Sequence, residues 1–443
     1  LMIFVVMVTI FSIGTELKHA TAREWIAAGN GSVWAALLGK VLPITAIMFL
    51  ISLVMLLINF KIVGTPLNGS LTVILIGTLL FILITKGKAP AYLGSSFAFI
   101  APATIVINNW GYQYALGGFV VVGACGCVLA FIIYKCGTDW INVVLPPAAM
   151  GPVVALIGLE LAGSAASTGC IVGDSVTTGT VITFLVTLAV AVFGSVLFRG
   201  FFSTIPILIA IICGYIAGVI TGVIDTQTIV DALHTSFISI PNFQTPKFDI
   251  NAILIILPVI LVIANEHIGH QLVTSKVVGR DLLKDPGLHR SLFADNFSTM
   301  ISGFIGSVPT TTYGENIGVM AITKVYSVRV IGGAAVLSII CSFVGPLAAL
   351  IQTIPGPVIG GISFLLYGMI GTSGLRILVD NHVDYSKNRN MILTSVIFVT
   401  GLSGVTLALG DVSLSGMTLA AIVAMIMSLV FHALDRAKLT NDV

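Results

Sequence analysis

The sequence predicts an all-α membrane protein that crosses the bilayer many times. Of its 443 residues, 57% are hydrophobic and 9% are charged, with a mean hydropathy of +1.10, whereas roughly a quarter of the residues in a soluble domain are charged. The apolar residues also form uncharged stretches of about 20 residues, the length of a helix that crosses the hydrocarbon layer. These observations exclude a soluble globular domain, a disordered chain and a secreted disulfide scaffold.

The apolar stretches follow one another along almost the whole chain. Gly is frequent, with 46 residues, which suits helices that pack closely in lipid. We expect clear spanning segments at residues 41–60, 114–134, 180–198, 203–224, 330–351, 391–410 and 413–434. We expect weaker or interrupted segments at residues 1–14, 70–85, 89–107, 140–161, 250–269, 291–307, 309–323 and 356–378.

Basic residues indicate how these segments are oriented. Short cytoplasmic loops retain Lys and Arg, whereas short loops on the other side carry few. Counting back from Arg436 and Lys438, the connections rich in basic residues all fall on one side, and the intervening loops hold almost none. The pattern predicts a cytoplasmic C-terminus.

One spanning stretch carries ionisable side chains. Residues 263–270 read Ile-Ala-Asn-Glu-His-Ile-Gly-His and end an apolar run that starts near Ile253. An ionisable residue at membrane depth is unfavourable, so it indicates a functional site. Glu266 and His270 are four residues apart and share a helix face, where they could exchange a proton, while His267 points elsewhere. The alternative is a helix end at the interface with both groups solvated.

Two other stretches are short and interrupted by Pro and Gly. Residues 310–318 read Thr-Thr-Thr-Tyr-Gly-Glu-Asn-Ile-Gly and follow Pro309, and residues 89–99 contain Pro90 and Gly94. Neither pattern predicts a continuous helix. Two interrupted segments in corresponding places of two halves indicate a transporter site, because non-helical backbone at that depth must face protein or water. The alternative is two re-entrant loops with structural glycines.

These groups predict the kind of ligand. The N-termini of half-helices offer N–H donors, and Glu266 and Glu315 offer acceptors. A planar pyrimidine dione satisfies both, whereas two carboxylates repel an anion unless they are protonated. Phe97 or Tyr313 could stack on the ring, although aromatic residues in membrane segments more often face lipid or the core.

Other classes of function lack support in the sequence. The six Cys residues show no paired spacing, and neither a nucleotide-binding loop nor a nucleophile–base pair occurs, so we expect no enzyme, no cofactor and no metal. A net charge of +2 without a basic face argues against nucleic acid. For Glu160 and Asp295, a place on a transport path, a structural hydrogen bond and a position at the membrane interface all remain open.

From about residue 76 to the C-terminus, the sequence resembles the bacterial uracil:proton symporters of the nucleobase/ascorbate transporter family. Residues 315–324 match the family signature of Glu or Gln, Asn, any residue, Gly, four residues, Thr, and a basic residue or Gly. Residues 266–270 and 90–97 match two further family segments. The resemblance implies two inverted repeats of seven spanning segments, with short paired strands in the third and tenth. It also implies a substrate-carrying core domain at residues 76–135 and 250–351 and a gate domain at residues 139–235 and 355–435.

The resemblance further implies roles for individual residues. Glutamates would accept hydrogen bonds from the ring, backbone groups would donate, and a tyrosine of the gate would face the site. The implied substrate-binding residues are Glu266, Glu315, Phe97, Gly314, Tyr313 and Tyr367, with Glu266 and His270 implied in proton coupling. The implied activity is uptake of uracil together with a proton across the bacterial inner membrane, and relatives suggest a homodimer. Glu315 at the head of the signature favours uracil, because purine-transporting relatives more often have Gln there.

Residues 1–75 depart from this family. They lack the Gln-His pair of its first spanning helix, and residues 23–25, 38–43 and 67–70 look more like the membrane subunit of an ATP-binding-cassette permease. The alternatives are a symporter of xanthine or another nucleobase, an anion transporter of the same fold, a subunit that works with an ATPase, and an inactive hybrid.

Overall fold

The computed structural model describes residues 67–440 except 138, 200–201, 204, 239–242 and 410–411. The expected segments at residues 1–14 and 41–60 and the atypical features before residue 67 lie outside this part. Its first half contains a helix, a short strand that leads into a half-helix, and a series of further helices. These elements are α5 (Leu67–Ile84), β1 (Leu93–Ser95), the 3-10 helix η2 (Phe97–Phe99), α6 (Ile100–Trp110), α7 (Tyr112–Cys136), α8 (Asp139–Val144), α9 (Pro147–Glu160), α10 (Ala162–Thr168), α11 (Thr178–Leu197), α12 (Pro206–Ile220) and α13 (Thr226–Leu233).

The second half repeats this order of elements. A helix again precedes a short strand and a half-helix, and a hairpin of two strands connects the last two helices. The elements are α14 (Ile250–Ile256), α15 (Val259–Val278), the short helical turn η4 (Leu283–Gly287), α16 (Leu288–Ile305), β2 (Thr310–Thr312), α17 (Gly314–Thr323), α18 (Val328–Ser342), α19 (Gly345–Gln352), α20 (Gly356–Asp380), α21 (Asn388–Leu402), β3 (Thr406–Leu409), β4 (Val412–Ser415) and α22 (Gly416–Arg436).

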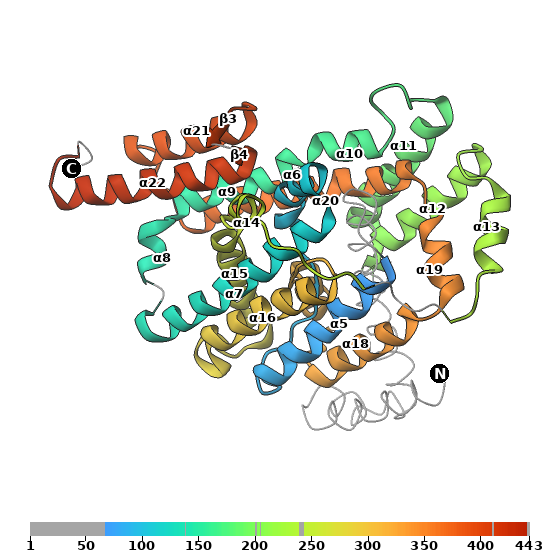
Figure 1. Ribbon diagram of the computed structural model, residues 1–443, viewed down its shortest axis with the longest axis horizontal. Helices are drawn as coiled ribbons and strands as arrows, with labels where there is room; N and C mark the ends of the chain where they lie inside the picture. The colour runs from blue at the N-terminus through green and yellow to red at the C-terminus, as the bar shows by residue number, and fades with distance from the viewer. Residues whose placement is uncertain are drawn as a thin grey trace.

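Helix packing supports the inverted repeat. By order along the chain, α5 in the first repeat corresponds to α16 in the second, and α7 in the first corresponds to α18 in the second. An inverted repeat therefore predicts that if α7 packs against α16, α18 packs against α5. Both pairs are packed together, and Figure 1 shows α5 along α18 and α16 beside α7. The prediction of an α-helical membrane fold with short paired strands in two broken segments is confirmed.

Close approach of backbones holds α7 against α16. A Cβ added at Gly123 of α7 would lie 2.6 Å from the Met300 nitrogen and 2.8 Å from the Asn296 oxygen of α16. Such contacts are closer than any side chain permits, so Gly is required at this position. Small residues of this kind are the usual interface of packed membrane helices.

Three of the expected spanning segments are split into two helices. Pro146 lies at the break between α8 and α9, and Pro258 lies at the break between α14 and α15. Pro has no N–H group to donate to the preceding helical turn, so it interrupts a helix. Between α18 and α19, Val344 is extended and pairs with Ile238, while the Gly345 nitrogen donates to the Phe237 oxygen at 2.9 Å. Pro346 stands in the first turn of α19, so a proline marks this third break as well, together with the bridge to a distant segment.

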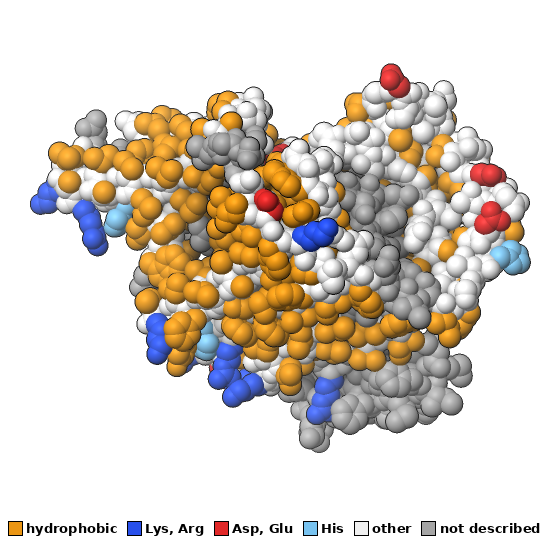
Figure 2. Space-filling view, viewed as in Figure 1, with side chains coloured by type: hydrophobic (Ala, Val, Ile, Leu, Met, Phe, Trp, Pro, Cys, Tyr) orange, Lys and Arg blue, Asp and Glu red, His pale blue; other side chains and the backbone are white. Residues whose placement is uncertain are grey.

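Five helical stretches of the described chain are long and apolar enough to cross a membrane. They are α7, α9 together with α10, α11, α20 and α22. On α11 and α12, Phe193, Val196 and Ile220 are more than half exposed, as suits side chains that contact lipid. Figure 2 shows hydrophobic side chains across this face of the molecule, with many Lys and Arg side chains along one edge of it.

Candidate functional site

The centre of the site is a short antiparallel pair formed by β1 and β2. Leu93 pairs with Thr312, Gly94 with Thr311 and Ser95 with Thr310. We call this β1–β2 pair the strand crossing. Each strand leads directly into a short helix, so the N-termini of η2–α6 and of α17 both lie at the strand crossing. Those N-termini present backbone N–H groups that no residue of their own helix can accept. The predicted half-helices and their donors are therefore brought together, although more than 200 residues separate Ser95 from Thr310.

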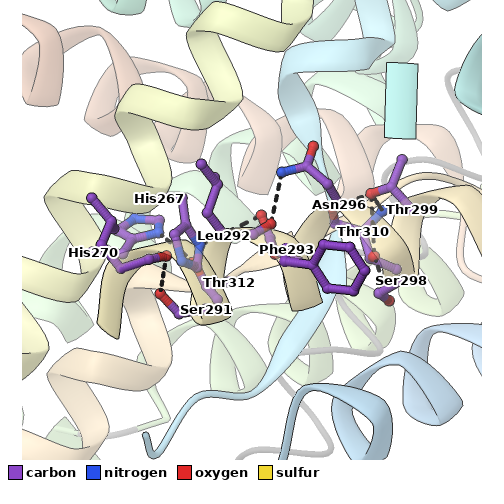
Figure 3. A network of polar contacts seen from close by, with 12 residues as sticks. His267, His270, Ser291, Leu292, Phe293, Asn296, Ser298, Thr299, Thr310 and Thr312 are labelled. Carbon is purple, nitrogen blue, oxygen red and sulfur yellow. Dashed lines mark hydrogen bonds and ion pairs between the residues drawn. The ribbon is translucent and has the colours of Figure 1, made fainter. Parts of the chain in front are cut away.

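Corresponding helices hold the two strands by threonine hydroxyls. In the first repeat, the Leu93 nitrogen donates to Thr78 Oγ1 of α5 at 3.0 Å. In the second repeat, the Thr310 nitrogen donates to Thr299 Oγ1 of α16 at 3.1 Å, and Thr299 Oγ1 donates to the Thr310 oxygen at 2.8 Å. Figure 3 shows Thr299 and Thr310 in this contact. The three β-branched threonines of β2 also favour an extended backbone.

The ring of Tyr313 covers Gly94 across the crossing. A Cβ added at Gly94 would overlap that ring, so only Gly fits beneath it. The Tyr313 hydroxyl is 3.0 Å from Ser95 Oγ, and the Tyr313 nitrogen donates to the Tyr92 oxygen at 3.2 Å. Tyr313 is only 5% exposed. The broken segment therefore fixes an aromatic ring immediately before the first turn of α17.

Gly314 and Glu315 form the first turn of α17. Tyr313 is the residue that precedes this helix, and its side chain makes no capping hydrogen bond. Gly314 lacks a side chain where His270 of α15 approaches, since a Cβ there would lie 3.0 Å from His270 Nε2. The backbone of Glu315 lies in α17, and its side chain is outside the described part of the structure.

Helix α15 carries both Glu266 and His270, and His270 contacts this region. Glu266 lies one turn before His270 and is partly exposed. His270 Nδ1 lies 3.1 Å from Thr312 Oγ1 of β2, while Nε2 faces Gly314. The predicted proton-coupling histidine is therefore in contact with both the strand crossing and the N-terminus of α17.

Tyr367 approaches the site from α20. It is 1% exposed, and its ring meets the ring of Phe97 edge-on, with centroids 5.8 Å apart and planes at 85°. Edge-on pairs of this kind are favourable because the positive rim of one ring faces the negative face of the other. Phe97, Tyr313, Gly314, His270 and Tyr367, all expected at the site, thus surround the strand crossing.

Two buried polar residues, His267 and Asp295, lie behind the strand crossing, although sequence reasoning assigned them no clear role there. His267 is fully buried on the face of α15 next to that of His270, and its Nδ1 lies 3.5 Å from Asp295 Oδ2 of α16 and 3.4 Å from Thr312 Oγ1. Figure 3 shows His267, His270 and Thr312 side by side. For Asp295, a place on a transport path, a structural hydrogen bond and an interfacial position were all expected possibilities, and its position inside the expected segment 291–307 was the only sequence signal for it.

Asn316 is another buried polar residue at this place. It is 1% exposed, and neither atom of its amide has a hydrogen-bond partner among the described residues. Glu160, the second acidic residue of open role, lies elsewhere and accepts a hydrogen bond from the Met417 nitrogen at 2.9 Å. No group of three or more His, Cys, Asp or Glu residues suited to a metal occurs in the described part of the chain.

The fold is that of a class of membrane transport proteins. It is similar to the murine Solute Carrier 26 family member A9 anion transporter in the inward-facing state, with a TM-score of 0.67 and 11% identity over 89% of this chain and 69% of that chain. It is also similar to the transmembrane domain of the cyanobacterial bicarbonate transporter BicA, with a TM-score of 0.57 and 16% identity over 89% of this chain and 96% of that one. At such identities the likeness concerns the fold alone.

Sequence comparison identifies the family within that class. Residues 46–410 match the model of the Permease family, and the chain belongs to this family. It is 54% identical to the uracil permease of Escherichia coli over 363 residues, which are 81% of this chain and 84% of that protein. It is 44% identical to the uracil permease of Bacillus subtilis over 384 residues, covering 84% and 87%. The family match begins at residue 46, upstream of the expected boundary near residue 76.

Proposed function

We propose that this multi-pass membrane protein takes up uracil across the bacterial inner membrane together with a proton. The observation that carries the proposal is the β1–β2 crossing, which brings two helix N-termini, the Phe97 and Tyr313 rings and His270 to one place. The relatives named uracil permease, which resemble the chain over most of its length, support this substrate.

Uracil complements the groups gathered there. Its two carbonyl oxygens accept hydrogen bonds from backbone N–H groups at Phe97 and Gly314, where the half-helices begin. Its two ring N–H groups donate to Glu266 and Glu315. Phe97 and Tyr313 provide flat apolar surface for a planar ring. A site with fixed donors and acceptors excludes rings that lack the matching groups, because their partners would stay unpaired.

The positions of the ionisable groups support proton coupling. Glu266 and His270 occupy one face of α15, and His270 also contacts Thr312 beside the head of α17. Protonation of this pair removes or adds a charge at the site and changes which hydrogen bonds the site can make. Proton and uracil then each favour binding of the other, with a coupling free energy of about 1–3 kcal/mol.

Movement of two domains then exposes the site alternately to each side of the membrane. We assign residues 76–135 and 250–351 to the core and residues 139–235 and 355–435 to the gate. The Phe97–Tyr367 contact joins an element of the proposed core to one of the proposed gate. The distribution of Lys and Arg supports a cytoplasmic C-terminus.

Uptake of labelled uracil into proteoliposomes tests the proposal. With a more acidic exterior, uracil should accumulate against its gradient, and a protonophore should abolish the accumulation. Glu266→Gln should eliminate coupled uptake. Glu160→Gln is the matched control and should retain it, because the Glu160 carboxylate lies elsewhere and accepts a hydrogen bond from the Met417 nitrogen. Accumulation that ignores the pH gradient would contradict proton coupling, and normal uptake by Glu266→Gln would contradict the role of that residue.

Anion transport is the second candidate, because two of the structural neighbours are an anion transporter and a bicarbonate transporter. The same proteoliposomes distinguish the two activities. Bicarbonate or sulfate transport without uracil binding would favour an anion transporter, whereas binding of uracil with no anion flux favours the nucleobase symporter.

A further inference from the structure

Four side chains from three elements form a continuous polar contact behind the strand crossing. Asp295 Oδ2 of α16 lies 3.5 Å from His267 Nδ1 of α15, which lies 3.4 Å from Thr312 Oγ1 of β2. Thr312 Oγ1 in turn lies 3.1 Å from His270 Nδ1. Asp295, His267 and Thr312 are at most 2% exposed. A buried acid and a buried imidazole in an otherwise apolar interior require a reason, since each is unfavourable without a partner.

The number of hydrogens in this contact is limited. The Thr312 hydroxyl has one hydrogen to donate, yet it faces Nδ1 of two histidines. Apart from His267, neither oxygen of Asp295 has a polar partner among the described residues. A carboxylate favours a hydrogen on the nearest imidazole nitrogen, here Nδ1 of His267. With that nitrogen already protonated, the Thr312 hydrogen is left for Nδ1 of His270.

We propose that Asp295 and His267 are positioning residues that act through Thr312 to set the protonation pattern of His270. In the neutral state, His270 Nδ1 accepts from Thr312, and the hydrogen of the ring is held on Nε2, which faces Gly314. When His270 takes up a proton, it enters at Nδ1, and the Thr312 hydroxyl turns from donor to acceptor. The inference rests on the proposed function, in which His270 couples the proton to uracil.

Other titratable and charged groups lie on α15 itself and on the elements packed against it. Glu266 precedes His270 by one turn of α15, and Glu315 heads α17 beside it. On α5, the ring of Phe81 meets His267 edge-on at 6.2 Å and carries no charge. Several charged groups on the other elements packed against α15 have partners elsewhere: Lys135 over Tyr134, Glu160 with Met417, Asp285 with Lys88 and Asp435 with Arg389. Lys284 of η4 and Arg436 of α22 are exposed, His289 of α16 packs on Tyr134, and Arg290 lies five residues before Asp295 on α16.

Uracil affinity measured across a pH series tests the proposal in purified protein. Protonated His270 donates to Thr312 and is attracted by the Asp295 charge, so removal of either group disfavours the protonated state. Thr312→Val and Asp295→Asn should each move the midpoint of the pH profile down by about one unit, a tenfold change in proton concentration. Thr312→Ser keeps the hydroxyl and should restore the wild-type midpoint. A purely structural role would change affinity at every pH alike.

The tautomer itself is measured by ¹⁵N NMR of histidine-labelled protein in bilayers, with the His270 signals assigned from a His270→Gln sample. The expected spectrum at neutral pH has a bare Nδ1 and a protonated Nε2 on His270. A protonated Nδ1 on neutral His270, or a Thr312→Val midpoint equal to that of the wild type, would overturn the proposal. Should the variants fail to fold, the wild-type spectrum decides. Wild-type protein that binds no uracil contradicts the proposed function instead, and the tautomer measurement still stands.

Discussion

Substitution of Gly94 by Ala tests the construction of the site most directly. The added methyl group would overlap the Tyr313 ring, which is 5% exposed and has little room to move. If the ring stays, overpacking of this kind destabilises by about 1–3 kcal/mol. If the ring moves instead, the 3.0 Å contact between its hydroxyl and Ser95 Oγ is lost, which costs about 1 kcal/mol. In either case the change costs about 1–3 kcal/mol at the binding site.

Equilibrium binding of labelled uracil to detergent-solubilised protein measures the consequence. If only 1.4 kcal/mol of this strain opposes binding, Kd rises about tenfold, and thermal stability should fall as well. Gly318→Ala is the matched control on α17, because a Cβ there meets no described atom within 4 Å. This control should keep its affinity, and its stability should be equal or higher because Ala is the better helix former.

A double-mutant cycle isolates the cause. In a Tyr313→Ala background the ring is absent, so Gly94→Ala should have little further effect, and the coupling free energy between the two positions should be about 1–3 kcal/mol. Equal effects of Gly94→Ala with and without the Tyr313 ring would refute the argument from overlap. So would a Gly94→Ala protein that binds uracil as tightly as the wild type.

Three further changes have expected outcomes. Phe97→Ala removes the edge-on contact with Tyr367, so uracil Kd should rise about two- to tenfold in the same binding assay. Tyr367→Phe keeps its ring and should change Kd less. An unaltered Kd in Phe97→Ala would show that this contact does not contribute to binding. The methyl group of Gly416→Ala would overlap the Glu160 carboxylate, and residue 416 has a φ of +54° that favours Gly, so thermal stability in detergent should fall. It should fall by more than in Glu160→Gln, which retains an acceptor for the Met417 nitrogen. Equal stability of Gly416→Ala and the wild type would argue against the contact. Gly123→Ala should loosen the α7–α16 contact and lower thermal stability. Gly163→Ala is the control and should not lower it, because a Cβ at Gly163 meets no described atom within 4 Å. Similar stability of the two variants would count against close backbone packing.

The broken segments illustrate how far local sequence information reaches. Pro90, Gly94 and the three threonines before Tyr313 were sufficient to predict non-helical backbone in two places, because φ restriction and β-branching act within a few residues. The pairing of these places was implied only by resemblance to a family. The register, with Gly94 beneath the Tyr313 ring, depends on contacts between residues about 220 positions apart.

Glu266 and His270 were predicted to share a face because an i, i+4 spacing is a local property of a helix. The partner of His270 was not predictable in this way. Thr312 belongs to another segment, and Asp295 reaches His267 from a third. Nothing in the sequence around Asp295 distinguishes a buried partner of a histidine from an interfacial hydrogen-bonding group.

The sequence by itself determined that the chain is a helical membrane protein, the approximate extent of most of its described spanning segments, and the positions of the polar residues proposed to form the site. Hydropathy and helix-breaking residues act locally, so these features need no knowledge of distant contacts. Only the tertiary structure decided that Val344 pairs with Ile238, that Tyr367 meets Phe97, and that Thr312 lies between two histidines. Those outcomes depend on which surfaces pack together, and such packing is set by the whole fold rather than by any one segment.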